Sequence, residues 1–320
     1  MGQEAAAGTS GPRIVHLDRM TMGGVEIPRP ALAHQWVEYE FTEPGEVVAR
    51  LQGAEVAIIN KVRMDAATLA ALPQLRLIAV TATGTDVVDS EAARARGVAV
   101  RNVVGYAGTS VAEHVVMLMF ALVRGLVPFR ESVIDGRWQN GRAFTVFAAP
   151  VRDLTGMRLG LIGSGAIAQA VADRARALGL EVVFAGRRGQ APGAGKTAFE
   201  DVLATCDIIS LHCPLTDETR HMLNAQTLAA MKPGAVIINT ARGALIDLEA
   251  LEGALDEGRI GGAGIDVAPV EPPPPGSPIL RLAARPNVIV TPHSAWLSEQ
   301  AVTLLARRTG ENIDAFLAGR

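Results

Sequence analysis

The sequence predicts an α/β protein made of two Rossmann-like, doubly wound parallel-sheet domains with a cleft between them. From Arg13 onward, short β-branched runs alternate with helical patterns, which is typical of parallel strands covered by helices. A long apolar helical run at 109–127 separates an early series of these units from a later one. The chain has 320 residues, which is long for one hydrophobic core. We therefore expect a discontinuous first domain of residues 1–102 and 290–320, and a second domain of residues 103–289.

The early series predicts one small sheet. Its strands are expected at 13–17, 55–60, 75–80 and 98–102, separated by helices such as 65–72 and 89–96. The helix at 109–127 then carries apolar residues on two opposite faces, which are Val111, Val115, Leu118 and Leu122, and Val116, Met117, Phe120 and Val123. Such a helix is buried all round, either against a second subunit or inside one chain. We interpret it as a dimer element and expect a homodimer, with the single-chain interpretation left open.

The later series predicts a complete doubly wound sheet, with strands at 158–163, 181–186, 207–212, 235–240 and 262–267. After a proline-rich break at 272–275, a strand at 288–293 and a helix at 297–317 follow, and we expect both to return to the first domain. The chain would then cross between the domains near 103 and near 290, which leaves the cleft between them.

Charge and cysteine content exclude several classes of protein. The 30 basic and 33 acidic residues are mixed along the chain, so no concentrated field favours a nucleic acid or an anionic membrane. Cys206 and Cys213 are the only cysteines, too few for a disulfide scaffold or a metal cluster. The N-terminus lacks the pattern of a signal peptide, and no apolar run is long enough to span a bilayer. We expect a cytoplasmic protein with no metal, whose first dozen residues form a mobile tail.

The motif G-S-G-A-I-A, from Gly163 to Ala168, lies between a predicted strand and a predicted helix. Gly163 permits the tight turn, and Gly165 lets the backbone approach a pyrophosphate. Amides at the helix N-terminus, from Ser164 and Gly165 to Ala166 and Ile167, then face the phosphate charge. The string recurs by chance in glycine-rich chains, but a strand-turn-helix context makes it informative. It predicts that 103–289 is a dinucleotide-binding domain.

The end of the next strand decides between the two nicotinamide cofactors. NAD enzymes usually carry a carboxylate there for the ribose 2′-hydroxyl, but no Asp or Glu occurs between Val182 and Phe199. Arg187 and Arg188 occupy that position instead, and guanidinium groups form paired, charge-assisted bonds with a 2′-phosphate. We therefore expect NADP, with NAD left possible. The alternative is a pair of solvated surface arginines.

Arg242, Glu271 and His293 follow predicted strands of the later series, where active-site loops gather. A carbonyl that accepts hydride needs a proton donor, and histidine titrates nearest to neutral pH. Glu271 could keep such a histidine charged, and Arg242 could supply fixed charge for a carboxylate and a carbonyl. The chain has five other histidines, and each of the three residues taken alone is more often structural than catalytic.

From about Ile14 to the C-terminus the chain resembles the D-isomer-specific 2-hydroxyacid dehydrogenase family. The matching stretches are TATGTDVVD (81–89), GTSVAEH (108–114), GSGAIAQAVA (163–172), LHCPLTDETRHML (211–223), NTARGALID (239–247), AGIDVAPVEPP (263–273) and TPHSAW (291–296). Residues 59–86, the VEPPP run and Trp296 look most like glycerate dehydrogenases and hydroxypyruvate reductases. Ala168 replaces the usual third glycine, and Gly186 with Arg187 replaces the usual acidic ending.

The resemblance implies roles for particular residues. It makes His293 the acid/base, Glu271 its partner and Arg242 the residue that orients and polarises a keto acid. Backbone amides at Thr83 and Gly84 would hold the substrate carboxylate, with Lys61 lining the same pocket. The positions that it places around the nicotinamide side of the cofactor are Thr109, Pro214, Thr240 and Asp266, with Asp266 near the carboxamide.

The resemblance predicts reduction of a small 2-keto acid, such as hydroxypyruvate or glyoxylate, to the D-2-hydroxy acid with NAD(P)H. Formate or phosphite oxidation is disfavoured because the family's formate enzymes carry glutamine where Glu271 stands. Phosphoglycerate dehydrogenase is disfavoured because its longer forms carry regulatory extensions, for which a chain ending at Arg320 has no room. A dinucleotide-sensing, corepressor-like binding protein stays open, since that class can keep the same three residues.

Overall fold

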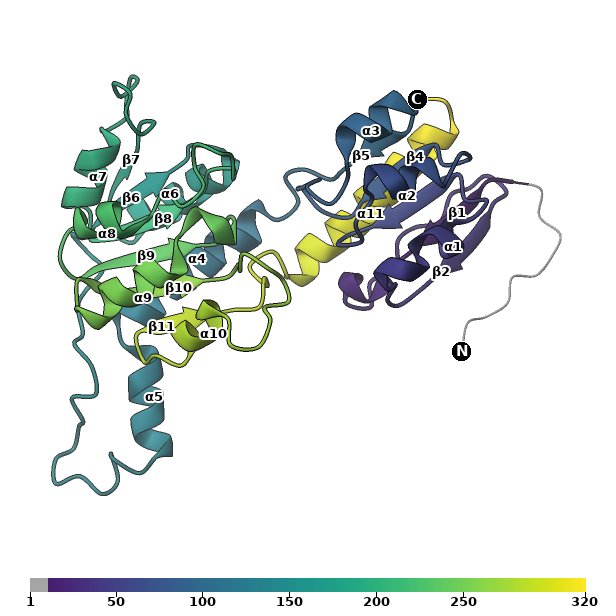
Figure 1. Cartoon of the computed structure of the whole chain (residues 1–320). Coiled ribbons are helices and arrows are strands. Elements are labelled where there is room, and N and C mark those ends of the chain that lie inside the picture. The colour runs from purple at the N-terminus through teal and green to yellow at the C-terminus, as the bar shows by residue number, and fades with distance from the viewer. Residues whose placement is uncertain (1–10) are drawn as a thin grey trace. The chain divides into compact units, whose positions relative to one another are not determined.

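The computed structural model describes residues 11–320, so most of the expected N-terminal tail lies outside the described residues. The described chain divides into two compact α/β units (Figure 1). The first contains the residues up to Ala107 together with Leu297–Arg320, and the second is Gly108–Trp296. The chain therefore passes between units after Ala107 and after Trp296, slightly later than the positions expected from the sequence.

The first unit is a parallel sheet with strand order β2-β1-β3-β4-β5. The strands are β1 (Arg13–His16), β2 (Gln35–Glu38), β3 (Val56–Ile59), β4 (Leu77–Val80) and β5 (Ala99–Arg101). The helices are α1 (Val47–Leu51), α2 (Ala66–Ala70), α3 (Ser90–Ala95) and α11 (Glu299–Leu317), and the 3-10 turns are η1 (Arg19–Met22) and η2 (Pro44–Glu46). One core cluster joins the sheet to α1, α2 and α3, and α11 contacts β4.

The second unit is a parallel sheet with order β11-β10-β9-β8-β6-β7. Its strands are β6 (Arg158–Ile162), β7 (Glu181–Phe184), β8 (Ile208–Leu211), β9 (Ala235–Asn239), β10 (Ile260–Ile265) and β11 (Val288–Val290). Its helices are α4 (Gly108–Val123), α5 (Leu126–Ile134), α6 (Ala166–Ala177), α7 (Phe199–Thr205), α8 (Ala225–Ala229), α9 (Leu248–Asp256) and α10 (Pro278–Ala283), with the 3-10 turn η3 (Gly243–Leu245). One core cluster contains residues of α4 and α6, and another contains residues of α7, α8, α9 and α10. The unit is therefore a doubly wound sheet with two hydrophobic cores.

The structure corrects one expected assignment. The strand predicted at 288–293 is β11, and it pairs with β10 rather than joining the first sheet. Val288 lies opposite Ala263 and Val290 opposite Ile265, so β11 extends the second sheet by one strand. Its apolar side chains complete the core of that sheet, and α11 is the element that returns to the first unit.

Two further features differ from the sequence-based expectation. The first sheet has a strand, β2, that was not expected, because an edge strand with half-exposed side chains shows no continuous apolar run. The helix expected at 109–127 ends at Val123, since Gly125 adopts a left-handed φ of 64° and α5 begins after it. In Figure 1, α5 and the loop that follows it extend away from the sheet of their unit.

The second apolar face of α4 is only partly buried within the chain, since Val123 is buried but Met117 and Phe120 are not. Val111, Val115 and Leu118 are buried, whereas Met117 is 47% exposed and Phe120 is 39% exposed. The expectation of burial on all sides is therefore wrong for a single chain. In residues 11–320 no single helix meets the length and hydropathy needed to cross a membrane; α4 and α5 meet them only as a pair bent by 61°.

Candidate active site

The turn between β6 and α6 has the shape expected of a phosphate-binding turn. Gly163 has a φ of +114°, and a Cβ there would lie 2.5 Å from the carbonyl oxygen of His212. Only glycine fits this approach between the ends of β6 and β8. At Gly165, the N-cap of α6, a Cβ would meet nothing within 4 Å. Open space in front of a helix N-terminus fits the pyrophosphate of a dinucleotide.

The neighbouring strand ends also fit a dinucleotide. Strand order reverses at β6, the position where doubly wound sheets bind such ligands. Burial lowers the pKa of His212 to about 4, so the ring beside the turn is neutral, and its Nε2 lies 2.9 Å from the Ser210 hydroxyl. The hydroxyl of Thr240, after β9, is buried without a hydrogen-bond partner in the described part of the chain. A bound ligand would supply that partner.

Arg187 and Arg188 lie exposed just after β7. Within residues 11–320 neither guanidinium pairs with a carboxylate. Gly186, before them, donates its N–H to the Thr197 carbonyl at 2.7 Å, so the two ends of the following loop meet. The arginines therefore lie at the position expected from the sequence, after the second strand of this sheet.

Both cysteines of the chain lie in this unit. Burial raises the pKa values of Cys206 and Cys213 to about 11, so both thiols are protonated at neutral pH. In the described ranges no group of three or more His, Cys, Asp or Glu side chains could hold a metal ion.

His293 and Glu271 form a direct pair. Nδ1 of His293 donates to Oε2 of Glu271 at 2.6 Å, and the two side chains are 30% and 28% exposed. The other carboxylate oxygen, Oε1, accepts the N–H of Ala268 at 2.9 Å, which fixes the carboxylate against its own loop. Because Nδ1 is taken by Glu271, Nε2 is the ring nitrogen that can exchange a proton with a substrate.

The backbone of His293 is held in an unusual conformation. Its φ is 53°, a left-handed value that costs a non-glycine residue about 1 kcal/mol. Its N–H donates to the Asp266 carbonyl at 2.7 Å. This bond ties the loop after β11 to the end of β10 and compensates for the strained backbone.

Asp266 organises the same loop through its side chain. The carboxylate is 1% exposed and accepts the Thr291 hydroxyl at 2.5 Å, the Ser294 N–H at 2.8 Å and the Ala295 N–H at 3.0 Å. His114 of α4 lies 3.6 Å from the carboxylate and 3.0 Å from the Thr291 hydroxyl. Burial lowers the pKa of His114, while the negative charge of Asp266 opposes that shift. Asp266 therefore positions the loop that bears His293.

Arg242 follows β9 and is half-buried. Its carbonyl accepts the amide of Asn239 at 2.9 Å, and Asn239 also accepts the N–H of Ala241 at 3.0 Å. The next residue, Gly243, packs so tightly that a Cβ would lie 2.1 Å from the Ala268 carbonyl carbon. This contact places the loop of Arg242 directly against the loop of Glu271, so the structure brings the three expected catalytic residues onto adjoining loops.

The other expected residues are spread more widely. Pro214 follows β8 and Thr109 lies in the first turn of α4, and both are exposed. Lys61, Thr83 and Gly84 belong to the first unit, at the carboxyl ends of β3 and β4. The Lys61 N–H donates to buried Asp18 at 2.8 Å, and the Thr83 hydroxyl donates to the Val103 carbonyl at 3.0 Å.

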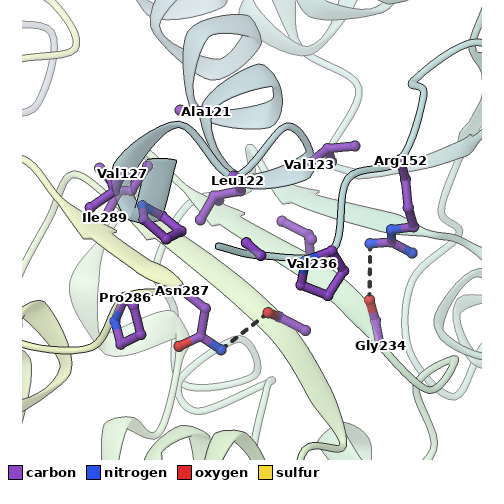
Figure 2. Close-up of a pocket in the computed structure, with 15 residues that line it drawn as sticks. Ala121, Leu122, Val123, Val127, Arg152, Gly234, Val236, Pro286, Asn287 and Ile289 are labelled. Atoms are coloured by element: carbon purple, nitrogen blue, oxygen red, sulfur yellow. Dashed lines mark hydrogen bonds between the residues drawn. The ribbon is translucent and has the colours of Figure 1, made fainter. Parts of the chain in front are cut away.

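A separate cavity of about 240 Å³ lies at the opposite edge of the second sheet (Figure 2). It is lined by residues at the amino ends of β9 and β11, such as Val236 and Asn287, and by the end of α4. The catalytic loops follow the carboxyl ends of the strands, so this cavity is not the active site.

Sequence reasoning did not single out Asp18 or Gly243, and it counted His114 only among the chain's other histidines. Gly243 acts through a backbone contact with a loop 25 residues away, which no local pattern reveals.

Comparisons with known proteins identify the family of this chain. The model of the D-isomer specific 2-hydroxyacid dehydrogenase NAD-binding domain matches residues 116–295. The glycerate dehydrogenase of Methylorubrum extorquens is 48% identical over 313 residues, covering 96% of this chain and 97% of that protein. The structure of the TT0316 protein from Thermus thermophilus has a TM-score of 0.82 at 36% identity, covering 96% of this chain and 97% of that one. An NADPH-dependent glyoxylate/hydroxypyruvate reductase from Sinorhizobium meliloti, solved with citrate, has a TM-score of 0.80 at 28% identity, covering 96% and 95%. The chain therefore belongs to the D-isomer specific 2-hydroxyacid dehydrogenase family of NAD(P)-dependent oxidoreductases.

Proposed function

We propose that this protein reduces a small 2-keto acid, hydroxypyruvate or glyoxylate, to the D-2-hydroxy acid with NADPH as the preferred cofactor. The observation that carries the proposal is the 2.6 Å pair of His293 and Glu271 on loops of a dinucleotide-binding sheet. The names of the similar glycerate dehydrogenase and glyoxylate/hydroxypyruvate reductase support the choice of substrate.

The proposed chemistry divides between the chain and its cofactor. When bound, the nicotinamide ring supplies the hydride that reduces the carbonyl carbon. Protonated His293 gives the Nε2 proton to the carbonyl oxygen, and the Glu271 carboxylate stabilises the charged ring before transfer. Arg242 donates to the keto acid and stabilises the charge that develops on its oxygen. In the reverse direction His293 acts as the base.

Cofactor and substrate residues complete the proposal. Backbone amides from Gly163 to Ile167, Ser164 and Ala166 included, would hold the pyrophosphate, and Arg187 and Arg188 the 2′-phosphate. We assign the nicotinamide side of the pocket to Thr109, Pro214, Thr240 and Asp266, the last acting through the loop that it holds. The amides of Thr83 and Gly84, with Lys61, would bind the substrate carboxylate. The cytoplasmic setting expected from the sequence stays a prediction.

We further propose that the protein is a homodimer joined through the second unit. The outer face of α4 exposes Met117 and Phe120, and the segment after α5 carries Phe144 and Phe147, which are 92% and 94% exposed. Apolar surfaces of this kind mark interfaces. A second copy of the chain is the partner that we propose. Every copy carries both surfaces, and a two-fold contact would bury both of them on each copy.

The substrate and cofactor are tested by initial rates. Hydroxypyruvate, glyoxylate, pyruvate and phosphohydroxypyruvate are each assayed with NADPH and with NADH. We expect the highest kcat/KM for hydroxypyruvate or glyoxylate with NADPH. A strong NADH preference would overturn the role of Arg187 and Arg188, and no keto-acid-dependent oxidation of either cofactor would overturn the activity itself.

A further inference from the structure

The loop between β7 and α7 returns to the point where it began. Ala185 and Thr197 form a parallel bridge, the Thr197 N–H donates to the Phe184 carbonyl at 2.9 Å, and the Gly186 N–H donates to the Thr197 carbonyl at 2.7 Å. Arg187 directly follows one end of this closure, and Lys196 directly precedes the other. The closure therefore brings two basic positions, nine residues apart in sequence, to the same edge of the sheet.

Lys196 also reaches the phosphate-binding turn. Its Nζ donates to the Ser164 hydroxyl at 3.3 Å. Ser164 stands between the two glycines of the turn, and β7 runs parallel to β6 up to the pairing of Phe184 with Leu161. The turn after β6, the arginines after β7 and the lysine before α7 thus adjoin one another at the carboxyl edge of the sheet.

Acidic residues are absent from the segment that carries these basic side chains. No Asp or Glu occurs between Val182 and Phe199, and among the described residues no carboxylate pairs with Arg187, Arg188 or Lys196. Lys196 contacts a neutral hydroxyl, and such a contact alone stabilises the position of an exposed lysine only weakly. Exposed cations that share one edge repel each other unless an anion binds between them.

We propose that Lys196, together with the Ser164 hydroxyl, is a further ligand of the 2′-phosphate of NADPH and a determinant of cofactor specificity. The inference rests on the proposed preference for NADPH. The end of β7 is where this fold places the 2′ position of the adenosine ribose, whereas the pyrophosphate lies at the N-terminus of α6. Lys196 supplies a point charge that complements the paired bonds of the arginines, and Ser164 supplies a neutral donor.

Direct binding tests the inference without turnover. Isothermal titration calorimetry measures adenosine 2′,5′-bisphosphate and adenosine 5′-monophosphate on the wild type, Lys196→Gln and Lys196→Arg. We expect Lys196→Gln to weaken bisphosphate binding about tenfold, since one charge-assisted bond is lost, with little change for the monophosphate. Lys196→Arg should restore most of the difference. Arg94→Gln, which removes one exposed positive charge from α3, is the control and should bind both nucleotides as the wild type does.

Each outcome separates the two proposals. If the wild type prefers the bisphosphate but Lys196→Gln binds it unchanged, the role of Lys196 is overturned and the NADPH preference stands. An equal loss for both nucleotides would assign Lys196 to the 5′-phosphate side or to loop folding, and would also overturn the inference. If the wild type binds the two nucleotides equally, both the NADPH preference and the role of Lys196 fail.

Discussion

At the scale of single residues, the orientation of His293 depends on two contacts from other loops and on its own backbone conformation. Glu271 fixes Nδ1, the Asp266 carbonyl fixes the backbone N–H, and the left-handed φ of 53° turns the residue out of its strand direction. The residue types could be predicted from the sequence because acid/base chemistry needs them. The left-handed backbone of a histidine could not, because tertiary contacts outweigh its local preference.

Arg242 gives the first prediction at this scale. Arg242→Ala should reduce kcat/KM for the keto acid by 10²-fold or more, since a charged donor to the developing oxyanion is lost. Arg242→Lys should recover only part of that loss, because an ammonium group cannot form the two parallel bonds of a guanidinium. Steady-state kinetics with each keto acid measure both variants, and NADPH binding serves as the control for folding. Unchanged kinetics in Arg242→Ala would remove this residue from the mechanism.

At the scale of elements, the candidate site is formed by the loops that follow the strands rather than by the strands themselves. Most strands could be predicted, because buried parallel strands show as β-branched runs. The edge strand β2 and the end of α4 at Val123 could not, since the first lacks an apolar run and the second is followed by further apolar residues, Leu126 and Val127. Loop-to-loop contacts such as that of Gly243 depend on the packed sheet and leave no local pattern.

Gly243 gives the prediction at this scale. In Gly243→Ala the new Cβ would overlap the Ala268 carbonyl group. This overlap would push the loops of Arg242 and Glu271 apart. We expect a fall in kcat of tenfold or more, because misplacement of about 1 Å can cost 10²-fold in rate. Gly253→Ala in α9 is the matched control, since a Cβ there meets nothing within 4 Å. It should keep wild-type activity and raise stability by about 0.5–1 kcal/mol. Equal activity of both variants would show that the loop contact does not position the site.

At the scale of the whole molecule, chain length and the two series of strands predict two units, and the structure has two. The assignment of β11 was wrong because a proline-rich break suggested a change of domain. Instead, β11 follows that break and pairs in parallel with β10. The proposed interface between copies is visible in a single chain only as exposed apolar surface. It rests on residues such as Phe144, whose apolar side chain has no neighbours to bury it.

The proposed dimer gives the prediction at this scale. The wild type should sediment as a dimer, and the double variant Phe144→Ser with Phe147→Ser should shift toward a monomer because it removes two nearly fully exposed aromatic rings from the interface. Phe41→Ser, at a 55% exposed position in the first unit, is the control and should stay dimeric. Sedimentation velocity over a range of concentrations measures all three. A monomeric wild type would contradict the interface.

The central claim is that His293 transfers the proton in reduction of the keto acid and does not hold the cofactor. The most direct test measures His293→Ala in two ways: the rate of hydroxypyruvate-dependent NADPH oxidation, and the Kd of NADPH from fluorescence titration. We expect kcat to fall by 10²-fold or more, since a positioned acid contributes 10²–10⁴ in rate, while the Kd stays within about twofold of wild type. Full turnover in His293→Ala would contradict the account.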